Sequence, residues 1–181
     1  MNCVVWNCHG LGNPRVVQEL TALVRNKDPA AVFIIETWLD DDHLEVIRCK
    51  LSFANKFVVL RRNRDGGLVL FWKCDLALTI QSFSFYHIDT LINEGTNEVW
   101  RFTGFYRAPK TQNRINSWNI LRTLHSQFSL PWCCARDFNE VASLDEKRGG
   151  RPRAELQMQF FHDVLDDCGF QHLGFHGPKF T

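Results

Sequence analysis

The stretch Pro131-Trp132-Cys133-Cys134-Ala135-Arg136-Asp137-Phe138-Asn139-Glu140 begins as a short apolar run and ends in a carboxylate, an aromatic ring and an amide. Apolar runs of this length are typical of strands buried on both faces, and polar groups just past their ends line a shared rim. The chain repeats the pattern three times upstream, where hydrophobic runs lead into Asn7, Glu36 and Tyr106. Four strands that each deliver one hydrogen-bonding or metal-binding group predict a site at one edge of the sheets.

Length and composition indicate a folded domain with a substantial core. The chain has 181 residues, of which 45% are hydrophobic and 13% aromatic. This length suits one domain, 1–181, and the composition argues against disorder. The net charge is only +1, so any attraction to nucleic acid must come from a local basic cluster.

The cysteines and the N-terminus predict the compartment. Seven cysteines, an odd number without C-x-x-C spacing, favour neither a disulfide framework nor a zinc site. We expect free, mostly buried thiols in a reducing environment. The chain enters a strand without a charged leader, and no uncharged apolar run reaches the ~20 residues of a membrane span. These features predict an intracellular protein of the nucleus or cytoplasm, neither secreted nor membrane-bound.

Helical periodicity predicts four helices. Asn13 caps the first, Pro14 occupies its first position and Asp28 ends it. The others cover 40–50, 115–128 and a last segment that stops at Gly169. The residues expected to face the core are Val16, Val17, Leu20, Leu23 and Val24 in the first helix; Leu44, Ile47 and Leu51 in the second; Ile115, Trp118, Leu121, Leu124 and Phe128 in the third; and Leu156, Phe160, Val164 and Leu165 in the last.

The middle of the chain predicts further strands. Residues 57–62, 66–72 and 76–85 follow one another with short turns, which is typical of an antiparallel meander. His87 lies in a strand, and 98–106 forms another strand after the turn 93–97.

The predicted rim has the chemistry of a magnesium site. Glu36 and Asp137 are hard oxygen donors, Asn7 and Asn139 offer amides, and Tyr106 offers a hydroxyl. Mg²⁺ takes oxygen ligands, usually one or two carboxylates together with water and substrate phosphate. A phosphodiester fits such a rim, because a cation offsets its charge while the amides and the hydroxyl orient it.

Each residue also has a simpler interpretation when it is taken alone. Asn7 suits a turn after a strand, and Glu36 suits the start of a helix. Tyr106 suits the edge of a core, and the segment Asp137-Phe138-Asn139 suits a turn. Only their joint order favours a catalytic site.

That order strongly resembles the endonuclease/exonuclease/phosphatase superfamily. Within it, the chain is most similar to the endonuclease domain of plant long-interspersed-element (non-LTR) retrotransposons, which resembles apurinic/apyrimidinic endonucleases. The resemblance covers essentially the whole chain, and the Asn-Pro helix start is specific to the retroelement branch. Its motifs are Trp6-Asn7-Cys8-His9-Gly10-Leu11-Gly12-Asn13-Pro14, Glu36-Thr37, Gly66-Gly67-Leu68, Thr103-Gly104-Phe105-Tyr106, Asp137-Phe138-Asn139 and Glu146-Lys147-Arg148-Gly149-Gly150.

The resemblance implies an α/β (α+β) fold, a deoxyribonuclease-like four-layer sandwich of two mixed β-sheets flanked by helices. It also implies Mg²⁺-dependent phosphodiester hydrolysis, with Mn²⁺ as the alternative cation and DNA as the partner. Glu36 would be the direct metal ligand beside Asn7, and Tyr106 would contact the scissile phosphate. Asp137 would orient or deprotonate the attacking water, and Asn139 would hold Asp137 and the phosphate. In retroelements this reaction nicks DNA to prime a reverse transcriptase, whose region lies downstream in the parent element.

Four departures from the family pattern matter. Arg136 and Arg107 stand where the family usually has glycine, and His9 stands where it usually has arginine. A long side chain hinders close backbone approach, so we expect the two arginines to disturb the rim rather than to bind phosphate. The family's domain also continues through further strands to a Ser-Asp-His motif, so we expect this chain to be incomplete at its C-terminus, with its missing strands beside residues 3–6.

A basic loop follows the predicted site. Lys147, Arg148, Arg151 and Arg153 occur together without an acidic residue, which fits either a solvated loop or a contact with DNA phosphates. Three hypotheses remain for the chain. It is a magnesium-dependent endonuclease impaired by its truncation, a non-catalytic remnant that binds nucleic acid weakly, or a phosphatase-type hydrolase on the same fold. The retroelement-specific first motif argues against the third, and the oligomeric state is left open.

Overall fold

The computed structural model describes residues 1–60, 66–106, 114–137 and 155–173. The chain forms two compact units, and the first contains Met1–Tyr106 and Leu130–Asp137. All eight described strands belong to this first unit, while α3 and α4 belong to the second. The elements are β1 (Cys3–Asn7), α1 (Pro14–Lys27), β2 (Ala31–Ile35), α2 (Asp41–Lys50), β3 (Asn55–Val59), β4 (Leu68–Trp72), β5 (Leu78–Ser84), β6 (His87–Ile92), β7 (Trp100–Tyr106), α3 (Arg114–Gln127), β8 (Trp132–Asp137) and α4 (Glu155–Asp167).

The first sheet has the strand order β1-β2-β4-β3. It places two predicted site residues at one end, because Asn7 ends β1 and Glu36 directly follows β2. β1 and β2 are parallel, with Asn7 opposite Ile35, whereas β4 runs antiparallel to both β2 and β3. α1 and α2 pack on one face of this sheet, where Leu20 and Leu44 join a buried cluster with Ile34. As predicted, Asn13 caps α1, because its Oδ1 accepts a hydrogen bond of 3.0 Å from the amide of Arg15.

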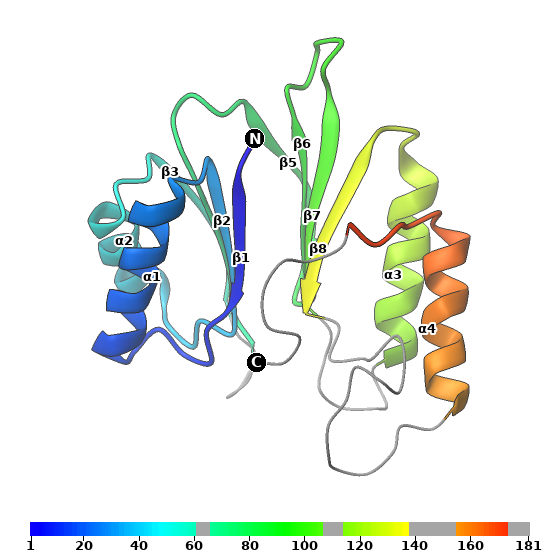
Figure 1. Cartoon of the computed structure of the whole chain (residues 1–181), viewed down its shortest axis with the longest axis horizontal. Coiled ribbons are helices and arrows are strands. Elements are labelled where there is room, and N and C mark those ends of the chain that lie inside the picture. The colour runs from blue at the N-terminus through cyan, green and yellow to red at the C-terminus, as the bar shows by residue number, and fades with distance from the viewer. Residues whose placement is uncertain (61–65, 107–113, 138–154, 174–181) are drawn as a thin grey trace. The chain divides into compact units, whose positions relative to one another are not determined.

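The second sheet has the order β5-β6-β7-β8 and repeats this arrangement. β7 and β8 are parallel, with Tyr106 opposite Asp137, and the remaining neighbours are antiparallel. The fold class is therefore confirmed as two mixed four-stranded sheets with helices. In Figure 1 the arrowheads of β1 and β8 point toward the same end of the first unit. The residues just past the parallel strands therefore gather at one rim.

The two sheets pack face to face through apolar side chains, and Gly104 lies where the Phe33 ring meets β7. The core between them includes Phe33 and Leu70 from the first sheet and Ile88 and Phe102 from the second. A Cβ atom added to Gly104 would lie only 2.6 Å from three atoms of the Phe33 ring. A glycine at this position therefore lets the ring pack directly on the backbone of β7.

The predicted antiparallel meander is wrong in one respect. β3 and β4 do pair antiparallel, but β5 belongs to the second sheet and pairs with β6. The chain changes sheets between Trp72 and Leu78. Strand β6, which the sequence signalled only through His87, is buried along its whole length. Apolar runs identify strands but do not specify which strand is the neighbour, so the pairing could not be inferred from them.

A polar network stabilises the second sheet. Asp89 in β6 accepts hydrogen bonds of 2.8 Å from Nε and Nη2 of Arg101 and one of 2.6 Å from the hydroxyl of Thr103. Trp132 in β8 donates to the same hydroxyl at 2.8 Å, and its ring lies 4.9 Å from the Arg101 guanidinium carbon. The carboxylate and the guanidinium are both fully buried. The network therefore links three adjacent strands with most of its charge compensated internally.

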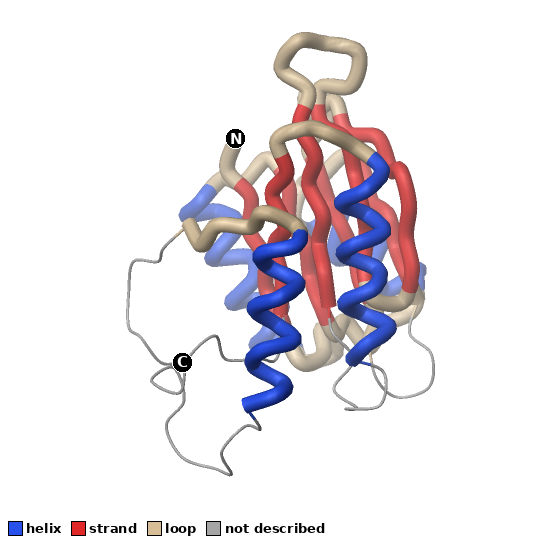
Figure 2. Tube along the Cα trace, turned by 90° about the vertical axis from the view of Figure 1, so that its right-hand side faces the viewer, coloured by secondary structure: helices blue, strands red, loops and turns tan. Residues whose placement is uncertain are grey.

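The second unit contains two helices that lie side by side (Figures 1 and 2). Arg122 of α3 and Asp167 of α4 form an exposed ion pair at 2.7 Å. The predicted stop at Gly169 is confirmed, because this residue, the second after the end of α4, adopts a φ of 62°. Val164 is buried as expected, but Phe160 is exposed, so its predicted inward orientation is wrong.

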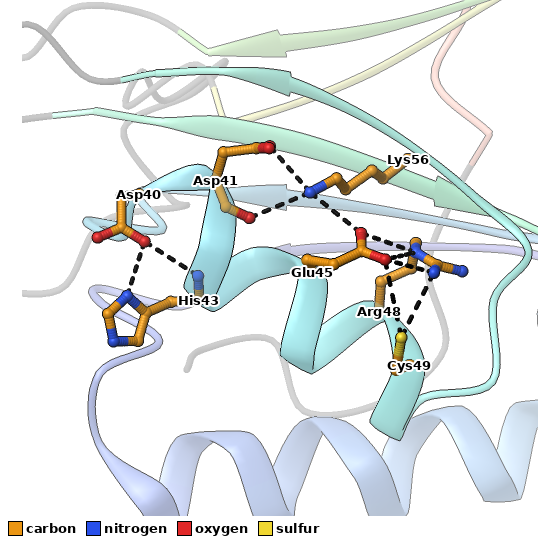
Figure 3. A network of polar contacts seen from close by, with 7 residues as sticks. All are labelled: Asp40, Asp41, His43, Glu45, Arg48, Cys49 and Lys56. Atoms are coloured by element: carbon orange, nitrogen blue, oxygen red, sulfur yellow. Dashed lines mark hydrogen bonds and ion pairs between the residues drawn. The ribbon is translucent and has the colours of Figure 1, made fainter.

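An ion-pair network fixes α2 to β3 at the surface (Figure 3). Lys56 in β3 contacts Asp41 at 2.9 Å and Glu45 at 3.1 Å, and Glu45 also pairs with Arg48. Hydrogen bonds from Arg48 and then from Lys56 lower the pKa of Glu45 to about 2. The opposite charges compensate one another between α2 and β3. Holding these two elements together is therefore enough to explain the network.

The cysteine prediction is partly confirmed. All seven cysteines are free, but only Cys8 and Cys168 are buried, so the expectation of mostly buried thiols is wrong. Within the described ranges, none of the helices combines the length and the apolar character needed to cross a membrane.

Candidate active site

Glu36 and Tyr106 meet at the rim where the two sheets end. The Tyr106 hydroxyl donates a hydrogen bond of 2.9 Å to Oε1 of Glu36. Tyr106 ends β7 and is buried in the core between the sheets, and Glu36 directly follows β2 with its side chain 14% exposed. The simpler interpretation of Glu36 as a helix-start carboxylate does not hold, because Asp40 caps α2. The carboxylate is instead held by a residue of the opposing sheet.

His9 holds the other oxygen of the same carboxylate. Its Nδ1 lies 2.8 Å from Oε2 of Glu36, while its backbone amide donates to the side-chain oxygen of Asn7 at 3.3 Å. An amide, an imidazole and a carboxylate therefore converge at the ends of β1 and β2. The sequence marked His9 only as a departure from the family pattern. Its place two residues after Asn7, in a glycine-containing turn, is the signal that could have identified it.

The thiol between these donors is not available as a ligand. Cys8 Sγ contacts the carbonyl oxygen of Ile35 at 3.4 Å, and burial raises the pKa of the Cys8 thiol to about 11. A metal ligand must be the thiolate, so a thiol that stays protonated at neutral pH contributes little. The donor set remains oxygen and imidazole nitrogen.

The backbone at this rim is strained. His9, Glu36 and Trp38 have φ values of 48°, 58° and 56°, in the left-handed region that side chains other than glycine disfavour. They are three of the six such non-glycine residues in the described chain. Strained residues of this kind persist where the surrounding structure fixes them, and they cluster at functional sites. The strain therefore supports a functional role for the loop 36–38.

Backbone hydrogen bonds from two neighbouring loops fix this strained segment. The amides of Gly10 and Leu11 donate to the carbonyl oxygens of Glu36 and Thr37 at 2.8 and 2.9 Å, and the amide of Thr37 donates to Gly67 at 3.1 Å. A Cβ atom on Gly67 would lie 2.6 Å from the Thr37 hydroxyl. Gly67, with a φ of 90°, therefore allows the turn before β4 to close on the site.

Thr37 leaves an unsatisfied hydroxyl beside Glu36. The residue is 1% exposed, and its Oγ1 is the only buried side-chain polar atom without a hydrogen-bond partner among the residues that the structure describes. An unpaired buried hydroxyl costs about 1–3 kcal/mol, and such groups in native proteins are often satisfied by a water or an ion. This atom therefore suits a site that takes up a hydrated or polar ligand.

The donors at the rim fit a divalent cation. Carboxylate and amide oxygens, such as those of Glu36 and Asn7, are the ligands that Mg²⁺ takes. His9 Nδ1 and Glu36 Oε2 are 2.8 Å apart in a hydrogen bond, and a cation bound by both atoms would replace the proton that they share. Within the described part of the chain, no group of three or more histidine, cysteine or acidic side chains is placed to hold a metal. The side-chain oxygen of Asn7, which accepts a hydrogen bond from the His9 amide, is a further oxygen donor at this rim.

The remaining predicted site residues are placed only in part. Asp137 ends β8 directly opposite Tyr106, so its backbone lies at the predicted rim. Asn139 lies outside the described residues, as do Arg107 and the basic positions Lys147, Arg148, Arg151 and Arg153. The structure thus brings together Asn7, Glu36 and Tyr106, and it adds His9 and Trp38.

Comparison with known proteins identifies the class. The model of the Endonuclease/Exonuclease/phosphatase family matches residues 4–181, so the chain belongs to this family. Members of the family are hydrolases that act on phosphoester bonds, and they are typically metal-dependent. No curated protein matches the sequence.

Solved structures share the fold at low sequence identity. The endonuclease domain of TRAS1, a telomere-specific non-LTR retrotransposon, is 13% identical with a TM-score of 0.67, covering 97% of this chain and 74% of that one. The 3′ phosphatase NExo from Neisseria, bound to a product DNA hairpin, is 12% identical with a TM-score of 0.65 and coverages of 92% and 71%. The AP endonuclease LMAP from Leishmania major is 14% identical with a TM-score of 0.66 and coverages of 92% and 66%. At these identities the likeness demonstrates the fold alone.

Proposed function

We propose that this chain hydrolyses phosphodiester bonds in DNA as a divalent-metal-dependent endonuclease of the retroelement type. The observation that carries the proposal is the Glu36 carboxylate, held by Tyr106 from one sheet and by His9 from the other. Glu36 is a carboxylate held in place at the ends of parallel strands, and the chain belongs to a phosphoesterase family. Both features suit metal-assisted hydrolysis.

Each residue of the proposed site has a role that its chemistry suits. Glu36, with Asn7 and His9, would hold Mg²⁺ or Mn²⁺, and such an ion, when bound, neutralises charge on the phosphate oxygens. Tyr106 would contact the scissile phosphate, redirecting to it the hydroxyl hydrogen that Glu36 accepts in this structure. Asp137 would accept the proton of the attacking water and Asn139 would orient that carboxylate. The proton leaves the water as its oxygen attacks phosphorus, and the 3′ oxygen departs with the electron pair of the broken bond.

The retroelement assignment supports a DNA substrate. It rests on the first motif, in which Asn13-Pro14 starts α1, and on the shared fold with a retrotransposon endonuclease domain. We propose that Lys147, Arg148, Arg151 and Arg153 contact the DNA backbone, because four cations without an acid give a local positive field in a nearly neutral chain. In the parent element, the nick would prime a downstream reverse transcriptase.

Metal binding and plasmid nicking test the proposal together. Calorimetry with Mn²⁺ should detect binding to the wild-type chain and to a Glu94→Gln control, which removes an exposed carboxylate from a turn. Glu36→Gln should lose that binding. Supercoiled plasmid should be nicked slowly but measurably by the wild type and the control, and not at all by Glu36→Gln or Asp137→Ala.

Two results would change the assignment. Undiminished Mn²⁺ binding by Glu36→Gln would move the metal away from this rim. Intact metal binding without any nicking by the wild-type chain would favour the non-catalytic, DNA-binding alternative.

A further inference from the structure

Trp38 presents an exposed indole next to the site. It stands two residues after Glu36, and 40% of its surface is exposed. Neither the metal-binding nor the proton-transfer roles proposed above use it. The residue also has a left-handed backbone, with a φ of 56°. The question is what an aromatic ring contributes at this position.

The indole is held against the turn that carries His9. A Cβ atom added to Gly10 would lie 2.6 Å from Cε3 of Trp38 and 3.1 Å from its Cζ3, so the six-membered ring rests on the glycine backbone. The hydrogen bonds from Gly10 to Glu36 and from Leu11 to Thr37 lock the two loops together. The ring is therefore fixed relative to the Glu36 carboxylate rather than free to adopt many rotamers.

Packing alone explains this arrangement poorly. A left-handed backbone at a residue other than glycine costs about 1–3 kcal/mol. Leaving much of an indole in water also forfeits part of the ~25 cal/mol per Å² that burial would contribute. Both costs fall on one residue, beside a buried unpaired hydroxyl at Thr37. A rigid, partly exposed aromatic surface next to a phosphate-binding site is the arrangement by which proteins stack unpaired nucleobases.

We propose that Trp38 stacks a nucleobase adjacent to the phosphate that is bound at Glu36. The inference rests on the proposed function, since it assigns that site a nucleic-acid strand whose base is unstacked at the nick. Stacking tolerates any base, because every base has a π face. Trp38 would thus favour single-stranded or locally opened DNA over a fully stacked duplex, without reading sequence.

Four proteins test the proposal: the wild type, Trp38→Phe, Trp38→Leu and Phe83→Leu. Leucine keeps an apolar cover over Gly10 but removes the π face, and phenylalanine keeps a smaller face. Phe83 is a matched control, because it is 60% exposed on β5, a strand that supplies none of the site residues. Thermal unfolding establishes that all four proteins are folded.

The assay compares two single strands by fluorescence anisotropy, with Ca²⁺ replacing Mg²⁺ to suppress cleavage. One is a mixed-sequence oligonucleotide, and the other has the same length but consists of abasic deoxyribose phosphates. Stacking contributes about 1–3 kcal/mol per base, so Trp38→Leu should weaken binding to the first strand roughly 5- to 150-fold. Trp38→Phe should lose less, and Phe83→Leu should match the wild type. On the abasic strand all four proteins should bind equally.

The comparison between the mixed-sequence and the abasic oligonucleotide decides whether Trp38 stacks a base. Equal binding of the mixed-sequence strand by the wild type and Trp38→Leu would refute stacking. An equal loss on both strands would also refute it, because it would show that Trp38 only supports the loop. Mn²⁺ calorimetry on the same preparations separates this result from a failure of the proposed function. Trp38→Leu should keep the metal binding that Glu36→Gln loses.

Discussion

Replacing Asp89 with alanine removes the countercharge of a buried arginine in the second sheet. The carboxylate pairs with Arg101 through two hydrogen bonds of 2.8 Å, and both side chains are within 1% of complete burial. It also accepts a hydrogen bond of 2.6 Å from Thr103. We expect this single substitution to be among the most destabilising in the chain.

The magnitude follows from the burial of the pair. Breaking a buried ion pair by removing one partner costs about 3–5 kcal/mol, because the remaining charge stays desolvated. Whole domains are stable by about 5–15 kcal/mol, so the loss would be a large part of the total. A double variant, Asp89→Leu with Arg101→Met, leaves no charge to desolvate and should recover most of the loss.

Urea unfolding followed by tryptophan fluorescence measures these differences. The matched control is Asp167→Ala, which breaks the exposed pair with Arg122 and should cost no more than about 1 kcal/mol. A loss below about 1 kcal/mol for Asp89→Ala, equal to that of the control, would refute the reasoning. It would mean that the Arg101 charge is solvated or compensated without Asp89.

Three further predictions address pH, packing and metal choice. Burial lowers the pKa of His87 from 6.5 to about 4, so the folded state resists a proton that the unfolded state accepts below pH 6.5. Stability should therefore fall by about 3 kcal/mol between pH 6.5 and 4, and urea unfolding of His87→Gln should lack that component. Gly104→Ala places a Cβ atom 2.6 Å from the Phe33 ring and should lower the free energy of unfolding by about 1–3 kcal/mol. Adding Phe33→Leu in a double variant should restore part of that stability, and additive losses would contradict this contact. His9→Ala removes an imidazole donor, so calorimetry should show Mn²⁺ affinity falling more than Mg²⁺ affinity, and an equal fall would exclude His9 as a ligand.

The rim could be predicted from the sequence because its signal is local. Each parallel strand is an apolar run that ends in a polar residue, and the ends of parallel strands meet at one edge. Asn7, Glu36 and Tyr106 accordingly lie where the pattern places them. The pairing of β5 and β6 could not be predicted in this way. β6 contains Asp89, and a buried carboxylate becomes favourable only once Arg101 of the neighbouring strand is known to pair with it.

The strained part of the site was hidden for a related reason. Left-handed backbone at His9, Glu36 and Trp38 is imposed by hydrogen bonds between loops that are distant in the chain. Local propensity gives no indication of it, because none of the three is glycine. The sequence therefore placed the Glu36 carboxylate at the rim but indicated neither the imidazole that pairs with it nor the indole that flanks it.

The geometry also couples the proposed metal site to the packing of the two sheets. Glu36 follows a strand of the first sheet, and the hydroxyl that orients it comes from Tyr106 in the second. Phe33 lies three residues before Glu36, and it packs against Gly104, which lies two residues before Tyr106. This contact between the sheets is therefore close to that hydrogen bond along both segments of the chain. A shift between the sheets would change the distance from the carboxylate to the hydroxyl before it unfolded either sheet. In variants that loosen the contact between the two sheets, metal binding should consequently be lost at a lower denaturant concentration than the β-sheet signal.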